Sequence, residues 1–159
     1  MPRGKYYQAL TRALHEEMAR DETVFVMGED VGESGGIFGQ TRGLYKTFGA
    51  ARMRDTPIAE NGFVSAAVGA AMTGMRPVVE IGFEDFVTCC MEPLVNQAAK
   101  LRYMLGGQVR IPLVLYTFGG GGLNAGPQHS QSLEAWFAHV PGLKVVIPAT
   151  PADMLGLSK

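Results

Sequence analysis

Glu60 is the residue of this sequence best placed for acid–base chemistry. It lies in the stretch from Asp55 to Gly62, where Pro57 restricts Thr56 to extended geometry and fixes its own φ at about −65°. The small residues that follow predict a helix that can be packed closely on most sides, so we expect Glu60 at a crowded place. A buried carboxyl group can hold or share a proton near neutral pH, which suits a catalytic acid or base. Simple capping is the alternative for an isolated glutamate before a helix.

Two further side chains could exchange protons, Glu29 and His129. Glu29 and Asp30 follow the apolar stretch 24–27, at the edge where open α/β sheets bind ligands. These acids could bind a metal, hold a proton or stay solvated in a loop. His129 follows a glycine-rich loop, where an imidazole can donate to a substrate or exchange a proton with it. The alternative for His129 is a surface histidine without a chemical role.

Phe86 is the candidate for binding a flat ring. With Phe83 it follows a predicted buried strand at 77–81, and such a pair of aromatic residues forms either part of the core or a cofactor platform. For a pair in this position, the core is the more common outcome.

Several other chemistries are disfavoured by the motifs that the sequence has or lacks. The stretch from Gly120 to Ala125 loosely matches a dinucleotide-binding pattern, but Pro127 and the polar residues after it begin no helix at the right place. The sequence contains no phosphate-binding P-loop and no G-x-S-x-G nucleophile elbow. Its two cysteines are adjacent, without the spacing of metal ligands.

Helices and short apolar strands alternate along the chain. The spacing of apolar residues, with proline and glycine as breaks, predicts helices at 6–20, 44–48, 62–73, 134–137 and from Pro151, and strands or extended segments at 24–27, 52–58, 77–81, 111–117 and 143–147. Residues 83–105 are predicted to form a loop and a long helix, which Pro93 either kinks or restarts. This alternation is typical of an α/β fold with a mainly parallel sheet and helices on both faces. Glu80 is unusual inside a buried strand and needs a partner there.

Composition limits the kinds of protein this chain can be. Of its 159 residues 47% are hydrophobic and 18% are charged, and its net charge is −1. These values show no excess of positive charge that would favour nucleic-acid binding, and no apolar run reaches the length of a membrane span. The N-terminus lacks the apolar region of a signal peptide, and Cys89 and Cys90 are expected to be buried thiols in a reducing compartment. We therefore expect a cytoplasmic protein without nucleic-acid or membrane partners.

An ordered series of motifs resembles one known family. The motifs are MGEDVG, GLYKTFG, DTPIAENGF, AAVGAAMTGMRPVVEI, VNQAAKLRYMLGG and QHSQSLEAWFAHVPGLKVVIPATPADMLGL. Together they resemble the β subunit of the thiamine-diphosphate-dependent decarboxylase component of 2-oxo acid dehydrogenase complexes, a family with pyruvate, acetoin and branched-chain members. The resemblance covers nearly the whole chain. It implies that residues 1–159 form the family's N-terminal, transketolase-like pyrimidine-binding domain, with the C-terminal domain absent and the last helix truncated.

The resemblance implies a role for each of the four candidate residues. Glu60 falls on the glutamate that hydrogen-bonds the cofactor's aminopyrimidine and shares a proton with it. Phe86 falls on the aromatic residue that packs on the pyrimidine face. Glu29 falls on an acid near the subunit interface that would join a proton path to Glu60. His129 falls on the histidine at the active-site entrance, which is associated with the substrate intermediate and the lipoyl group.

The resemblance also implies partners. The family's diphosphate and Mg²⁺ motif, G-D-G…N, is not found in this sequence and belongs to the α subunit, so the expected assembly is an α2β2 heterotetramer that serves a lipoyl acyltransferase core and acts on a small 2-oxo acid. The chain alone is then expected to be inactive. One departure is Tyr116, which stands near the end of a strand where we expect the family's arginine. Two alternatives remain open: the pyrimidine-binding half of a transketolase-like enzyme, and a non-catalytic fragment that binds a partner.

Overall fold

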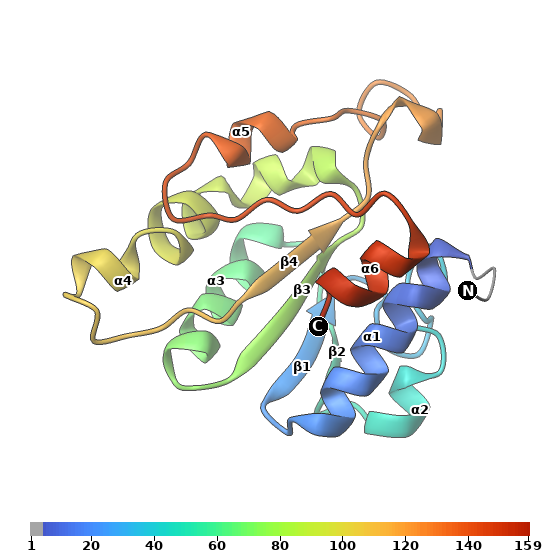
Figure 1. Cartoon of the computed structure of the whole chain (residues 1–159), viewed down its shortest axis with the longest axis horizontal. Coiled ribbons are helices and arrows are strands. Elements are labelled where there is room, and N and C mark those ends of the chain that lie inside the picture. Colours follow the sequence, from blue (N-terminus) through green and yellow to red (C-terminus); the bar gives the residue numbers. More distant parts are fainter. Residues whose placement is uncertain (1–4) are drawn as a thin grey trace.

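The computed structural model describes residues 5–159 and shows a parallel sheet covered by helices on both faces (Figure 1). The elements are, in chain order, α1 (Tyr6–Arg20), β1 (Val24–Gly28), α2 (Leu44–Phe48), β2 (Met53–Asp55), α3 (Glu60–Met72), β3 (Arg76–Ile81), η1 (Glu84–Cys90), η2 (Glu92–Ala98), α4 (Leu101–Met104), β4 (Val114–Thr117), η3 (Gly121–Leu123), α5 (Glu134–Ala138) and α6 (Pro151–Leu157). The predicted α/β architecture is confirmed.

The sheet has the strand order β2-β1-β3-β4, and all of its pairs are parallel. Every residue of β1 is buried, as expected for an apolar strand covered on both faces. Val24 and Val26 face a cluster formed with α1, α2 and α6, whereas Phe25 and Met27 face the opposite cluster. Successive side chains of a strand point to opposite faces, so this one short run contributes to both halves of the core.

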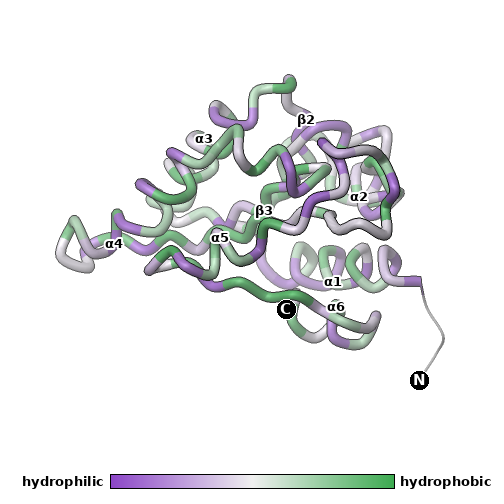
Figure 2. The backbone as a smooth tube through the Cα atoms, turned by 90° about the horizontal axis from the view of Figure 1, so that it is seen from above, coloured by the Kyte–Doolittle hydropathy of each residue, from purple (hydrophilic) through white to green (hydrophobic). Residues whose placement is uncertain are grey.

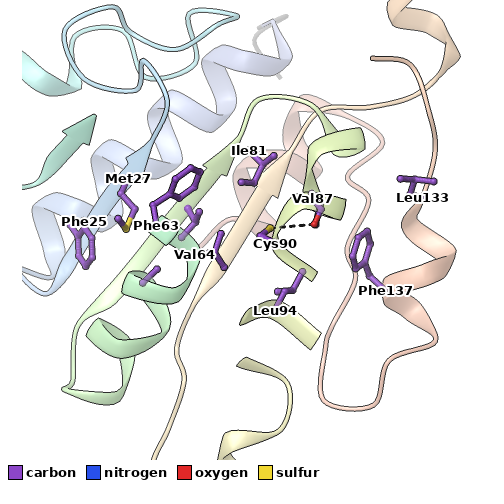
Figure 3. Packing of buried hydrophobic residues seen from close by; sticks show 12 residues of the cluster. Phe25, Met27, Phe63, Val64, Ile81, Val87, Cys90, Leu94, Leu133 and Phe137 are labelled. Atoms are coloured by element: carbon purple, nitrogen blue, oxygen red, sulfur yellow. Dashed lines mark hydrogen bonds between the residues drawn. The ribbon is translucent and has the colours of Figure 1, made fainter. Parts of the chain in front are cut away.

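The second cluster joins the sheet to α3, η1, η2 and α5 (Figure 3). Phe63 and Val64 project from α3, and Val87 and Leu94 carry the packing on to Phe137 of α5. This cluster places η1 and α5 above one end of the sheet. The predicted helices at 6–20 and 44–48 have the bounds of α1 and α2, and Pro151 begins α6 as expected.

The single long helix predicted within 83–105 is wrong, although the restart predicted at Pro93 is confirmed, because Pro93 lies in the first turn of η2. The chain instead forms the 3-10 helix η1, the π-helix η2 and the short helix α4. Pro93 has no backbone N–H, so a regular α-helical ladder cannot continue through it. The wider π geometry follows, with the N–H of Ala99 donating to the carbonyl of Leu94 at 3.1 Å.

The predicted strand at 143–147 is also wrong, because this segment forms no strand in the structure. Leu143 packs against the core, but the valines and the isoleucine that follow are exposed, with Val146 at 56% and Ile147 at 67% of full exposure. Figure 2 shows it as a hydrophobic stretch leading to α6. A strand needs a neighbouring backbone to pair with, and apolar composition does not reveal whether one is in reach.

Two expectations about burial need correction. Cys90 is buried, and its thiol donates to the carbonyl of Val87 at 3.3 Å (Figure 3), but Cys89 is exposed. The small-residue helix α3 buries one face through residues such as Phe63 and Ala67, whereas Gly62, Ser65, Ala66 and Gly69 are exposed. The prediction that this helix is packed closely on most sides is therefore wrong, since one face of α3 packs against the sheet, η1 and η2 while the opposite face is exposed.

Gly142 is a position where only glycine fits the backbone. Its φ is +102°, and an added Cβ would overlap the carbonyl of Ala99. Gly142→Ala is expected to lower the free energy of unfolding by about 2–4 kcal/mol, since left-handed strain adds to overpacking. Gly74→Ala is the matched control, because Gly74 has φ +99° and open space around it. It should cost about 1 kcal/mol. Equal losses in urea titrations of the two variants would contradict the steric argument.

Candidate active site

The carboxyl ends of three strands meet at one edge of the sheet. Gly28 of β1 pairs with Glu80 of β3, which pairs in turn with Tyr116 of β4. In a parallel sheet this register places the segments that follow β1, β3 and β4 at the same edge. Those segments carry Glu29, the aromatic residues of η1 and the glycine-rich loop before His129, in that order.

Glu60 is the first residue of α3 and is half-buried. The segment before it is tied to β1, since the N–H of Thr56 donates to the carbonyl of Gly28 at 2.9 Å. Burial, and after it the charges of Glu60 and Cys89, raise the pKa of Cys90 to about 12. Glu60 therefore stands where α3, the end of β1 and η1 converge. The helix dipole favours an acid in the first turn of a helix, but the N-cap position of α3 is Ala59 and no side chain makes a capping hydrogen bond there.

Glu29 is brought close to Glu60. Burial, followed by the charges of Glu60, Asp30 and Glu80, raises the pKa of the Glu29 carboxyl above its ordinary value. Its Oε1 atom is buried and has no hydrogen-bond partner within residues 5–159. No ion pair in the described part of the chain involves Glu29, Glu60 or Glu80. The Glu29 carboxyl therefore lies among other acids without a cation, which favours its neutral form.

Phe86 and His129 are also brought together. The His129 ring stands edge-on to Phe83 at 4.7 Å and to Phe86 at 5.1 Å between centroids. Phe83 contacts Phe38 at 5.9 Å, and Phe38 contacts Phe118 at 4.9 Å. His129 is therefore a half-buried member of an aromatic cluster at the edge of the sheet, and the alternative of a free surface histidine is disfavoured.

Glu80 has the partners that its burial requires. Its exposed fraction is 1%, and it accepts hydrogen bonds from Gln40 Nε2 at 2.5 Å and from the hydroxyl of Tyr116. Gln40 is fully buried and uses its Oε1 to accept the N–H of Phe38 at 2.8 Å. Burial raises the pKa of Glu80, although both donors act in the opposite direction. Tyr116, where an arginine was expected, leaves Glu80 with neutral partners only.

Sequence reasoning missed three residues of this region. Phe83 was assigned to the core, yet it contacts His129 as closely as Phe86 does. Gln40 gave no signal, because the residue it binds is 40 positions away. Asp85 could have been found, since an acid directly after a buried strand and between two phenylalanines stands where ligand sites form.

The candidate residues line neither of the two hollows found on the surface of residues 5–159. A surface hollow lined by Ala98, Arg102, Tyr103 and Gly142 contains none of them. Residues 5–159 include no cluster of three His, Cys, Asp or Glu side chains suited to a metal ion. None of the helices in this range is long and apolar enough to cross a bilayer.

A family model decides the classification. The model described as the transketolase pyrimidine-binding domain matches residues 4–159. The chain belongs to this family. A solved structure described as "Split gene transketolase, inactive beta4 tetramer" is similar in fold to this pyrimidine-binding domain, with a TM-score of 0.73, 19% identity, and coverage of 95% of this chain and 45% of that one. The predicted transketolase-like fold is confirmed.

The curated relatives of this pyrimidine-binding domain are β subunits. The chain is 47% identical over 154 residues to the 2-oxoisovalerate dehydrogenase subunit beta of Bacillus subtilis (strain 168), covering 97% of this chain and 47% of the relative. It is 49% identical over 152 residues to the pyruvate dehydrogenase E1 component subunit beta of Rhizobium meliloti (strain 1021), covering 96% and 33%. It is 46% identical over 159 residues to an acetoin:2,6-dichlorophenolindophenol oxidoreductase subunit beta of Cupriavidus necator, covering 94% and 47%. The resemblance drawn from the motifs is confirmed, and the chain spans about half or less of these relatives' lengths.

Proposed function

We propose that this chain supplies the aminopyrimidine half of a thiamine diphosphate site in a 2-oxo acid dehydrogenase of the pyruvate or acetoin type. The observation that carries the proposal is the half-buried Glu60 at the start of α3, next to Glu29. Burial and the charge of Glu60 favour the protonated form of Glu29, so this pair of residues can keep a proton beside the cofactor. The β-subunit relatives support the assignment of the reaction class.

The residues present fit the cofactor's pyrimidine ring. The ring carries an amino group and a protonatable nitrogen, and Glu29 Oε1 is a buried acceptor with no partner within residues 5–159. The rings of Phe83 and Phe86, together with the other aromatic residues around them, suit the packing of a flat heterocycle. No G-D-G…N motif for the diphosphate and Mg²⁺ occurs in this sequence, so those groups are assigned to a partner α subunit.

Each of the four residues then has a distinct task. When bound, thiamine diphosphate supplies the carbon nucleophile and the electron sink for decarboxylation of a 2-oxo acid. Glu60 would hold a proton at the pyrimidine ring nitrogen, and Glu29 would join a proton path to Glu60, giving up its own proton when Glu60 needs one. Phe86 packs on the ring. His129, at the outer side of the aromatic cluster, faces the substrate and the lipoyl group of an acyltransferase core.

The test is an activity measurement on the assembled protein. The chain is co-expressed in its full-length reading frame with an α subunit of the same genome, loaded with thiamine diphosphate and Mg²⁺, and purified as the expected α2β2 assembly. Turnover of pyruvate, branched-chain 2-oxo acids and acetoin is followed by reduction of 2,6-dichlorophenolindophenol, and ketol transfer between sugar phosphates is followed in parallel. Decarboxylation of a 2-oxo acid or cleavage of acetoin supports the proposal. Ketol transfer alone would assign the chain to a transketolase-like enzyme, and the absence of all three activities would favour a partner-binding role.

A further inference from the structure

The segment that carries His129 has little regular structure of its own. Between β4 and α5 the chain forms only the three-residue helix η3, and Asn124 to Gln128 are exposed. His129 nevertheless keeps a defined position against two phenylalanines. Something other than secondary structure must therefore fix this loop, and two adjacent buried acids of η1 are in contact with it.

Asp85 binds the loop two residues after His129. Its exposed fraction is 5%, and its Oδ1 atom accepts hydrogen bonds from the side-chain Nε2 of Gln131 at 2.7 Å and from the Gln131 N–H at 3.4 Å. The carbonyl of Gln131 accepts the N–H of Gly120 at 2.7 Å. One carboxylate oxygen thus fixes both the side chain and the backbone of Gln131. Gln131 in turn joins the end of the loop to Gly120, near the point where the loop leaves β4.

Glu84 binds both ends of the same loop. Its Oε1 accepts the N–H of Leu133 at 3.0 Å, and its own N–H donates to the carbonyl of Phe118 at 2.8 Å. Gly119 passes so close to the Glu84 carboxylate that an added Cβ would overlap it. Burial is the main cause that raises the pKa of Glu84, followed by the charge of Glu134.

Polar and aromatic contacts to the loop come from one short stretch. Phe83 and Phe86, which contact the His129 ring, directly flank Glu84 and Asp85 in the sequence. Four consecutive residues therefore determine where the loop backbone runs and where the imidazole stands. A displacement of about 1 Å at such a site can cost up to about a hundredfold in rate.

We propose that Asp85 is a positioning residue for His129, which it fixes against Phe83 and Phe86 by binding Gln131. The inference rests on the proposed function only for the chemical task of His129. The contact itself is independent of which substrate the assembled enzyme uses.

The second carboxylate oxygen of Asp85 makes it possible to change the charge of this residue without breaking its hydrogen bonds to Gln131. Oδ2 is buried and has no partner in the described part of the chain. Asp85→Asn can therefore keep an oxygen toward Gln131 and place its amide nitrogen where Oδ2 stands, so no existing bond is lost. Asp85→Leu has a similar size but no acceptor. Gln131→Glu sets two carboxylates against each other. Combining it with Asp85→Asn restores a side-chain donor–acceptor pair, because the new amide can turn its nitrogen toward the carboxylate, and only the longer contact with the backbone N–H at 3.4 Å is given up.

The experiment compares these variants in the assembled α/β enzyme with two readouts. The first is kcat/KM for the 2-oxo acid or acetoin, which should fall about tenfold in Asp85→Leu and Gln131→Glu, stay within about twofold in Asp85→Asn, and recover in the double variant. The second is the rate at which diethyl pyrocarbonate modifies His129, followed by mass spectrometry. That rate should rise severalfold in the two impaired variants, whereas the exposed His15 and His139 serve as internal references.

The outcomes separate the two proposals. An unchanged His129 modification rate in Gln131→Glu, or failure of the double variant to recover, overturns the positioning role even if Asp85→Leu does not fold. Changed reactivity of His129 in an assembly that turns over no 2-oxo acid or acetoin supports the positioning role and overturns the proposed function instead.

Discussion

Replacing Glu60 with glutamine is expected to lower kcat of the assembled enzyme by about 10²- to 10⁴-fold, the usual range for loss of a general acid–base group. Glutamine keeps the size and one hydrogen-bonding oxygen, but it cannot give a proton to a ring nitrogen or take it back. The loss should therefore appear mainly in kcat. Binding of thiamine diphosphate, measured by titration of the assembly, should weaken much less.

Glu22→Gln is the matched control for this variant. Glu22 is an exposed acid that follows α1 and belongs to none of the clusters at the sheet edge. The same change of charge there should leave kcat within about twofold of the wild-type value, as expected for a surface substitution. Near-normal turnover of the Glu60→Gln enzyme would contradict the assignment of Glu60 as the proton partner of the cofactor.

Replacing Glu80 with leucine is expected to lower the free energy of unfolding by about 2–5 kcal/mol. The change leaves the fully buried amide of Gln40 and the hydroxyl of Tyr116 without their acceptor, and each unsatisfied buried group costs about 1–3 kcal/mol. Glu80→Gln is the matched variant, because a glutamine can accept from Gln40 and donate to the oxygen of Tyr116. Urea titrations should show a large loss for leucine and a small change for glutamine.

The pH dependence of stability gives a second measurement on Glu80. Burial raises its pKa in the folded chain above the ordinary value of 4.5. Its contribution to stability is therefore fully present below about pH 4.5 and is lost as the pH rises through the raised folded-state pKa. Glu80→Gln removes this loss, so the variant should gain stability relative to the wild type as the pH rises above about 4.5. Parallel pH profiles for the two proteins would show that Glu80 keeps its ordinary pKa in the fold.

Helices could be predicted from the sequence where the spacing of apolar residues and the positions of proline and glycine indicated the same bounds. The apolar spacing of α1 and the proline at the start of α6 predicted those helices correctly. The prediction for residues 83–105 failed because the apolar residues there have helical spacing, which predicted one long helix. Pro93 and the buried acid side chains of η1 instead determine the backbone, which forms three short helices. The predicted strand at 143–147 failed because a strand forms only where the backbone can pair with the edge of another strand. Whether such an edge lies nearby is decided by the assembled sheet and not by the local sequence.

The candidate site was predictable as two separate halves. The sequence indicated Glu29 and Glu60 as proton-exchanging groups, and the structure brings them together. It indicated Phe86 and His129 separately, and the structure joins them through a cluster that also contains Phe83. Contacts between residues that follow different strands could not be inferred from the sequence. Such contacts depend on the path that each loop takes back to the ends of the strands, and the sequence does not give that path.

The attachment of α5 to the buried acids also has a spectroscopic consequence. The chain contains a single tryptophan, Trp136, which lies in α5 three residues after the Leu133 N–H that Glu84 binds. Its indole is 55% exposed, while its neighbour Phe137 is packed in the core. The protein thus carries one natural fluorophore on the segment that includes His129. Its emission reports rearrangements of that segment without an introduced label.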